Sequence, residues 1–152
     1  MADLTCKDLC MTFKNQQSGA KVEALSDINF TLKKGELLSV LGPSGCGKTT
    51  LLNMIAGFIT PTNGSIMLGD RLIEGPGADR GMVFQQGALF EWLTVAKNVD
   101  FGLRMQGVSE IKSREQVEKW LVTVGLQGFA NTPTYQLSGG MQQRVALARC
   151  LI

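Results

Sequence analysis

Histidine is absent from this sequence of 152 residues, and cysteine, tryptophan and tyrosine occur only four, two and one times. Without histidine, a Ser-His-Asp or Cys-His nucleophilic system and any histidine-ligated metal are excluded within these residues. The cysteines do not form the paired pattern of a zinc site, because only Cys6 and Cys10 are close in the sequence. Any chemistry must therefore use backbone amides, lysine, hydroxyls, side-chain amides or carboxylates.

Long apolar runs and a strong charge bias are also missing. No run approaches about 20 residues, the length of a transmembrane helix, and the N-terminus lacks the basic and apolar regions of a secretory signal. Fifteen basic and thirteen acidic residues give a net charge of +2, which argues against a nucleic-acid partner. Because 44% of the residues are apolar, the chain can form a core. Composition predicts a soluble cytoplasmic domain.

Glycine is in excess, with 18 copies in 152 residues, whereas an average protein has about 7%. Apolar periodicity predicts mainly strands up to about residue 85 and mainly helices after it. The segment 37–41 is nearly continuously apolar, as in a central parallel strand covered on both faces. The other expected strands are 4–13, 28–32, 65–68 and 81–84. The expected helices are 48–58, 94–105 and 109–124, the last with a capping box from Ser113 to Gln116 and a C-terminal cap at Gly125.

A first glycine motif, GPSGCGKT from Gly42 to Thr49, matches the pattern G-x-x-x-x-G-K-[ST] between an expected strand and an expected helix. Its glycines let backbone N–H groups approach phosphates, and the helix N-terminus adds a positive dipole end. Lys48 supplies a mobile charge for β- and γ-phosphates, and the Thr49 hydroxyl suits Mg²⁺. We predict a nucleotide-binding P-loop made of Gly42, Pro43, Ser44, Gly45, Cys46, Gly47, Lys48, Thr49 and Thr50.

A second glycine motif, LSGGMQQR, runs from Leu137 to Arg144 at the start of an expected helix. Ser138 is a suitable N-cap, and apolar residues follow at helical spacing. One interpretation is a glycine-containing turn that enters a helix. The other is a second anion site, with free amide donors at a helix N-terminus.

The two motifs together resemble those of ABC-type ATPases. Ser138 follows Lys48 by 90 residues, which leaves no room for the long insertions of the DNA-repair and chromosome-organising relatives and is similar to a transporter subunit. Gln85, in the sequence MVFQ, resembles the Q-loop glutamine of the family, and Phe13 resembles its adenine-stacking aromatic residue. Taken alone, Gln85 could instead be a solvent-exposed strand end and Phe13 an ordinary core aromatic.

The resemblance implies an α/β fold, a P-loop NTPase core of the ABC type that is incomplete at its C-terminal end. Residues 1–85 would form the P-loop and β core, with an antiparallel N-terminal β-subdomain, and residues 86–152 the helical subdomain with the signature motif. It also implies a head-to-tail dimer that holds two ATP molecules with Mg²⁺. Each P-loop would bind one ATP, and the opposing Ser138, Gly139 and Gly140 would close over its γ-phosphate. Lys48 and Gln85 would be catalytic, and Thr49 and Gln85 would reach the Mg²⁺.

The stretches 69–85 and 96–103 resemble the ATPases of nitrate, sulfonate and taurine importers, most closely the taurine type. This implies transmembrane permease subunits and, indirectly, a periplasmic solute-binding protein as partners, and a peripheral place on the cytoplasmic face of the bacterial inner membrane. Glu91-Trp92 departs from the Pro-Trp that is common in this group. The segment 87–92 is a candidate docking surface for the permease, and the alternative is a surface loop with a buried tryptophan.

The family continues beyond its signature helix to an apolar strand that ends in Asp-Glu and, later, to a switch histidine. None of these occurs in the 152 residues. We therefore expect an N-terminal fragment that retains the residues for ATP binding but does not itself hydrolyse ATP. The full-length protein would couple ATP hydrolysis to uptake of a small anion, taurine or another sulfonate. The alternative is a hydrolysis-incompetent nucleotide-binding or partner-binding module.

Overall fold

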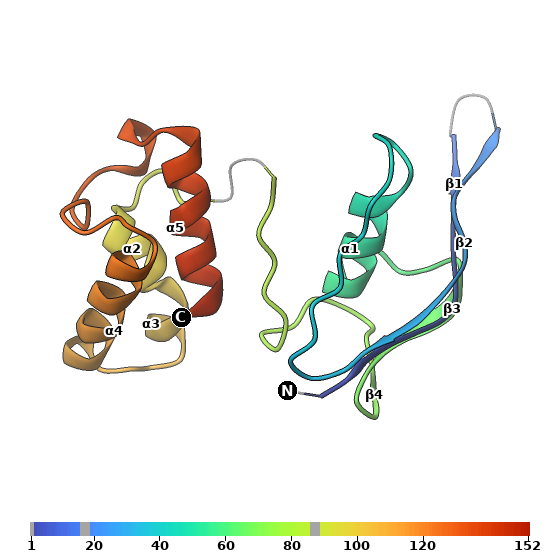
Figure 1. The fold of residues 1–152 in the computed structure, drawn as a ribbon, viewed down its shortest axis with the longest axis horizontal. Helices are drawn as coiled ribbons and strands as arrows, with labels where there is room; N and C mark the ends of the chain where they lie inside the picture. Colours follow the sequence, from blue (N-terminus) through green and yellow to red (C-terminus); the bar gives the residue numbers. More distant parts are fainter. Residues whose placement is uncertain (1, 16–18, 86–88) are drawn as a thin grey trace. The chain divides into compact units, whose positions relative to one another are not determined.

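The computed structural model describes residues 2–15, 19–85 and 89–152. The chain divides into two units, Met1–Arg80 and Gly81–Ile152. Each unit has its own hydrophobic core and its own secondary structure, strands with one helix in the first unit and helices in the second (Figure 1). The fold therefore consists of two separate structural environments, and each contains one of the glycine motifs.

The first unit is built on a four-stranded antiparallel sheet. Its strands are β1 (Leu4–Lys14), β2 (Lys21–Leu32), β3 (Asn63–Leu68) and β4 (Arg71–Leu72), in the spatial order β2-β1-β3-β4. The alternating apolar residues at the end of β2 are half-buried and the polar residues between them are exposed, as expected for a strand with one face on a core. The strands predicted at 4–13, 28–32 and 65–68 are confirmed, and β2 begins earlier than its prediction.

Helix α1 (Lys48–Ala56) packs on this sheet and buries Leu51 and Met54 (Figure 1). It ends at Gly57, which adopts the left-handed conformation with φ of 84°. A Cβ at Gly57 would lie 2.2 Å from the carbonyl oxygen of Gly75, so only glycine fits this helix end. The core of the unit consists of Cys6, Leu9, Met11, Leu25, Leu51, Met54 and Ile66.

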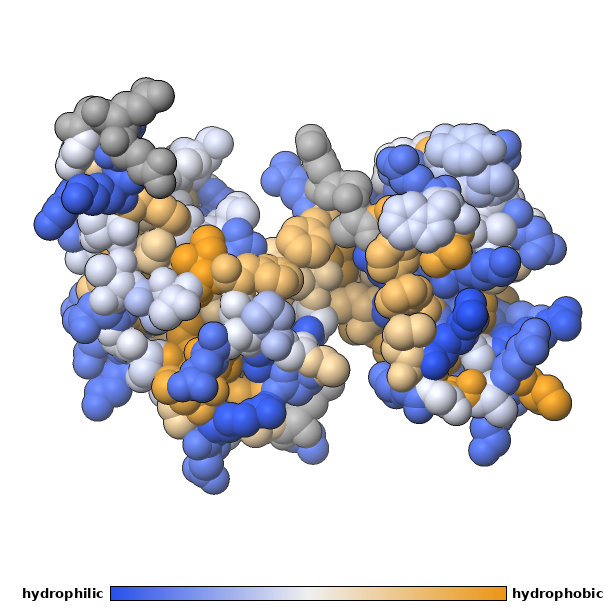
Figure 2. Space-filling view, turned by 180° about the vertical axis from the view of Figure 1, so that it is seen from behind, coloured by the Kyte–Doolittle hydropathy of each residue, from blue (hydrophilic) through white to orange (hydrophobic). Residues whose placement is uncertain are grey.

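Two predicted strands are wrong in this structure. The segment 37–41 has no strand structure, and Leu37 and Leu41 are 95% and 88% exposed. Figure 2 shows apolar side chains at the surface of this unit. The segment 81–84 also lacks strand structure. Apolar patterning predicts burial correctly only where neighbours exist, and within the described residues all the paired strands are antiparallel and none pairs with either segment.

The second unit is helical. It contains α2 (Val95–Val99), α3 (Phe101–Met105), α4 (Glu110–Thr123), the 3₁₀-helix η1 (Thr134–Gln136) and α5 (Gly139–Leu151). Its core consists of Val95, Val99, Val117, Leu121, Leu126, Leu137, Val145 and Ala148. None of the helices in the described part of the chain is both long and apolar enough to cross a membrane.

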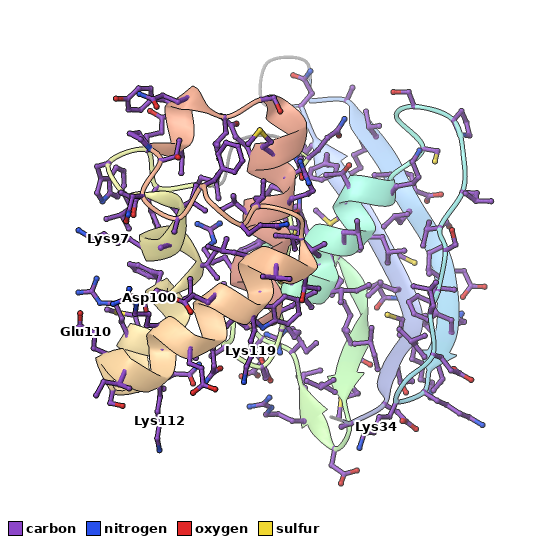
Figure 3. All side chains as sticks on the ribbon, turned by 60° about the vertical axis from the view of Figure 1, so that its left-hand side comes forward. Lys34, Lys97, Asp100, Glu110, Lys112 and Lys119 are labelled. Carbon is purple, nitrogen blue, oxygen red and sulfur yellow. The ribbon has the colours of Figure 1, made fainter. Side chains whose placement is uncertain are left out.

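The predicted capping box at Ser113 is wrong, because α4 begins at Glu110 and its N-cap is Ser109. Ser113 lies inside the helix and is buried, and its hydroxyl donates to Asp100. Asp100, which is labelled in Figure 3, lies between α2 and α3. The helix predicted at 94–105 is interrupted at the same Asp100. The predicted cap at Gly125 is confirmed, with φ of 66° and the N–H of Leu126 donating to Leu121 at 2.7 Å. Local sequence therefore located the helices and their first residues, but it misplaced the capping box of α4.

Candidate functional site

The P-loop owes its shape to two glycines in the left-handed conformation. Gly45 and Gly47 have φ of 82° and 94°, and Gly47 is the residue immediately before α1. A Cβ on Gly47 would lie 2.6 Å from the carbonyl oxygen of Ala24 and 2.8 Å from Leu25 Cδ2. Strand β2 therefore packs directly against the loop backbone, and any side chain at Gly47 would push the two apart.

Lys48, the first residue of α1, reaches back across the loop. Its ammonium donates to the carbonyl oxygens of Gly42 at 2.8 Å and Pro43 at 2.6 Å, and it lies 3.6 Å from Cys46 Sγ. A fixed cation and a helix N-terminus thus occur within one exposed loop. This arrangement can bind a phosphate group, because the ammonium supplies charge and the backbone amides supply directed donors.

The remaining predicted loop residues lie where a hard cation and a nucleotide could reach them. Ser44 and Thr49 are exposed and Thr50 is half-buried, and both threonines belong to the first turn of α1. An exposed hydroxyl beside a phosphate-binding loop fits the oxygen-ligand preference of Mg²⁺. The glycine cradle and this hydroxyl therefore fit a magnesium nucleotide.

Phe13 belongs to the same unit and lies near the end of β1, where it pairs with Val22 of β2. It is 41% exposed, so it is not the ordinary core aromatic that was the alternative. An exposed ring of this kind offers a face for stacking. Stacking on adenine remains a prediction.

The second glycine motif opens α5. Ser138 is the N-cap, as predicted, and its hydroxyl accepts a hydrogen bond from the Met141 N–H at 3.3 Å. Gly139 and Gly140 are the first two helical residues, and neither has a positive φ. A Cβ on either glycine would find no atom within 4 Å. Nothing within the described structure therefore requires glycine at these two positions.

Gln85 lies in the second unit, is exposed, and is connected to α5 through a residue that the sequence did not single out. The Gln143 side-chain amide donates to the carbonyl oxygens of Gln85 at 2.6 Å and Phe84 at 3.2 Å. The neighbouring Gln142 amide donates to Thr134 at 3.1 Å and Leu137 at 3.4 Å. The sequence shows only two adjacent glutamines after the glycines, and contact over 58 positions leaves no local signal.

The residues around Phe90 are held by a buried side-chain amide. Asn98 of α2 is fully buried; its side chain accepts from the Phe90 N–H at 2.8 Å and donates to the carbonyl oxygens of Phe90 and Thr94, each at 3.1 Å. Arg149 of α5 lies 5.1 Å from the centre of the Phe90 ring, and burial lowers the pKa of its guanidinium. Together these contacts hold the segment against α2 and α5.

This fixed segment presents Trp92, which is 79% exposed. The alternative of a loop with a buried tryptophan is therefore wrong. The first part of the docking surface predicted at 87–92 lies outside the described residues, which resume at Leu89. The described part offers an aromatic side chain to solvent, next to Phe90 at a ring separation of 5.3 Å.

The predicted site residues divide between the two units. Phe13 and the loop from Gly42 to Thr50 belong to the first, and Gln85 with the three signature residues belongs to the second. Within the second unit, the structure brings the Gln85 backbone and the signature helix together through Gln143.

Comparison with known proteins places these features in one family. The sequence pattern described as ABC transporter matches residues 25–152 of this chain. The taurine import ATP-binding protein TauB of Pelagibacter ubique is 70% identical over 152 residues, which cover 100% of this chain and 57% of that protein. TauB of Escherichia coli is 55% identical over 128 residues, 84% of this chain and 50% of that protein. The chain thus spans about half the length of the curated relatives it matches.

Solved structures agree with the sequence relatives. A dimeric post-hydrolysis state of the ATP-binding cassette MJ0796 bound to ADP and Pi is 34% identical, with a TM-score of 0.86, over 97% of this chain and 68% of that chain. A second dimeric structure of MJ0796, described as a bacterial ABC transporter cassette, has a TM-score of 0.87 at the same identity and coverage. The α/β fold of an ABC ATPase with an antiparallel β-subdomain and a helical part is thereby confirmed. From its motifs, its fold and these relatives, the chain belongs to the ABC transporter family.

Proposed function

We propose that this chain is part of the ATP-binding subunit of an ABC importer that couples ATP hydrolysis to uptake of taurine or another small sulfonate. The observation that carries the proposal is the 70% identity to a taurine import ATP-binding protein over all 152 residues. Two further taurine import proteins, from Roseobacter denitrificans and Jannaschia, are 56% and 54% identical over 151 residues. Identity of this extent supports a shared substrate class more strongly than the shared fold does.

ATP with Mg²⁺ would bind at the P-loop. The loop amides and Lys48 would hold the β- and γ-phosphates, Thr49 and Gln85 would reach the Mg²⁺, and Phe13 would stack on adenine. The metal neutralises charge that develops on the transferring phosphoryl group. Lys48 already lies across the loop on two carbonyl oxygens, so its charge is held at the position where phosphates would enter. The contribution of these side chains is positioning and electrostatic stabilisation, without a covalent intermediate.

Ser138, Gly139 and Gly140 would close over the γ-phosphate of an ATP molecule bound to a second copy of the subunit, in a head-to-tail dimer. The open space around both glycines supports this, because a phosphate can approach a helix N-terminus only where no side chain intervenes. The dimeric state of MJ0796 bound to ADP and Pi supports assembly of two copies.

The membrane partners would be permease subunits, with a periplasmic solute-binding protein acting through them. In this assembly the chain lies at the cytoplasmic face of the inner membrane, bound peripherally. The exposure of Trp92 supports a docking role for the described part of the segment 87–92, since an exposed aromatic side chain is a frequent anchor at interfaces.

Solute uptake by the full-length protein assembled with its permease and solute-binding protein tests the proposal. We expect uptake of labelled taurine, with less uptake of other sulfonates and none of nitrate, together with ATP hydrolysis. Lys48→Ala should lower both activities by at least about 100-fold, because the lysine stabilises charge on the transferring phosphoryl group. Hydrolysis that survives Lys48→Ala would refute the ATPase assignment, and uptake of nitrate in preference to taurine would refute the substrate class.

A further inference from the structure

Adjacent glutamines in the first turns of α5 connect to two different loops. Gln142 donates to the turn that leads into the signature motif, through the carbonyl oxygens of Thr134 and Leu137. Gln143 donates to the carbonyl oxygens of Phe84 and Gln85. Successive helical residues point about 100° apart, so one helix can hold a different loop on each of two faces.

The donor assignment for Gln143 follows from its partners. Both partners are main-chain carbonyl oxygens, which only accept, so the side-chain nitrogen must face them. Its two hydrogens serve the two carbonyls, and the bond to Gln85 is the shorter, at 2.6 Å. The amide therefore binds a carbonyl oxygen on each side of the Gln85 Cα.

This attachment matters because no sheet holds the Gln85 segment in the described structure. Residues 81–85 have no strand structure, and Gln85 is exposed. Outside a sheet, the position of such a backbone depends on the side-chain contacts that it makes. The Gln143 amide thus fixes the base of the Gln85 side chain to α5.

We infer that Gln143 is a positioning residue that couples Gln85 to the signature helix. The inference rests on the proposed function, in which Ser138 contacts ATP of the second subunit and Gln85 contacts Mg²⁺ of its own. Gln143 lies five residues after Ser138 on the same helix, a separation of about 7.5 Å at the rise of an α-helix. A displacement of α5 when Ser138 meets the opposing phosphate carries the Gln85 backbone with it.

A merely structural hydrogen bond and a coupling bond predict different behaviour in a double-mutant cycle. If Gln143 acts through the Gln85 side chain, removing that side chain first makes the later loss of Gln143 nearly silent. If Gln143 only stabilises the fold, its loss has the same effect in both backgrounds. Gln142 provides the matched control, because it is also an α5 glutamine that donates to two carbonyls but not to the Gln85 segment.

The experiment uses the full-length protein and the variants Gln143→Met, Gln142→Met and Gln85→Ala, alone and combined. Methionine keeps the length and helix propensity of glutamine but donates no hydrogen bond. We measure kcat, KM for ATP, the Mg²⁺ concentration for half-maximal rate, and the thermal midpoint. Gln143→Met should lower kcat about 10-fold and raise the Mg²⁺ requirement several-fold at unchanged KM for ATP. In the Gln85→Ala background it should change either quantity less than 2-fold, whereas Gln142→Met should act equally in both backgrounds.

The pH dependence of the Gln143→Glu variant supplies a second test, because it compares one variant with itself at different pH values. An ionised glutamate cannot donate, whereas the protonated acid donates one hydrogen bond. Because a glutamate titrates near pH 4.3, the rate of this variant relative to the unsubstituted protein should rise as the pH falls from 8 to about 5. Equal effects of Gln143→Met in both backgrounds, or a flat pH ratio, overturn the inference. If the unsubstituted protein shows no Lys48-dependent hydrolysis, the proposed function fails first and the inference with it.

Discussion

The two glycine motifs of this chain look alike in sequence but use glycine for opposite reasons. In the P-loop, Gly47 has φ of 94° and lies too close to Ala24 for any side chain. In the signature motif, Gly139 and Gly140 have no positive φ and nothing within 4 Å of a Cβ. The first motif needs glycine in order to fold, whereas nothing in the described structure requires glycine in the second.

The two motifs also differ in the hydrogen bonds that hold their backbones. The P-loop is also closed by its own lysine, which donates to Gly42 and Pro43. In the signature motif, the hydrogen bonds come from the Ser138 hydroxyl, which accepts from Met141, and from the Gln142 amide, which donates to Leu137. Replacing Gly47 should therefore lower stability, and replacing Gly139 or Gly140 should affect assembly and turnover.

The largest expected effect is on the free energy of unfolding of two matched variants. Gly47→Ala should destabilise the full-length protein by about 2–4 kcal/mol, because the left-handed backbone is unfavourable for alanine and its Cβ would overlap strand β2. Gly140→Ala should leave stability unchanged or raise it by up to about 1 kcal/mol, since alanine favours the helix. Urea unfolding of both variants measures the difference.

The rate of ATP hydrolysis gives a second comparison of Gly47→Ala and Gly140→Ala. Gly140→Ala should lower the rate of hydrolysis although its folding is intact, because its methyl group would occupy the space that we propose for the opposing phosphate. Equal destabilisation by the two alanines, or full turnover in Gly140→Ala, would show that the two motifs do not differ in the way described.

A smaller effect is expected from alkylation of two cysteines in the first unit, Cys46 and Cys6. Cys46 is exposed in the P-loop with Lys48 Nζ 3.6 Å from its sulfur, whereas burial raises the pKa of the Cys6 thiol from 9.0 to about 11. At pH 8, Cys6 remains a protonated, buried thiol, so iodoacetamide should modify Cys46 and leave Cys6 intact. The adduct beside Lys48 should weaken ATP binding by about 10-fold or more, or about 1.4 kcal/mol.

Mass spectrometry of the labelled protein and ATP titration check this expectation. Cys46→Ser is the control, because it should bind ATP before and after treatment alike. Retained ATP affinity after complete modification of Cys46 would contradict it.

The smallest effect concerns the helix caps of the second unit. The Ser138 hydroxyl accepts from Met141, whereas the N-cap Ser109 of α4 makes no such bond. Ser138→Ala should therefore cost about 1 kcal/mol of unfolding free energy, and Ser109→Ala only a few tenths. Thermal unfolding of the two variants compares them directly, and equal shifts in Tm would argue against a structural role for the Ser138 hydroxyl.

The sequence was a good guide wherever the determining forces are local. The loop from Gly42 to Thr49, the cap at Ser138 and the turn at Gly125 follow from residue types that set φ or supply a hydroxyl within a few positions. The capping box predicted at Ser113 was wrong: Ser113 lies within α4, and its buried hydroxyl binds Asp100 instead of capping the helix. A contact across 13 positions has no signature in a helical pattern.

By itself, the sequence determined the glycine loop before α1, the cap of α5 and the family, since short motifs encode backbone conformation directly. Only the tertiary structure decided that the apolar segment 37–41 is exposed and unpaired within the described residues, because a strand exists only with a hydrogen-bonded neighbour. It also decided that Gln143 holds Gln85 across 58 positions. Folding brings these two residues together, and no local propensity anticipates such a contact.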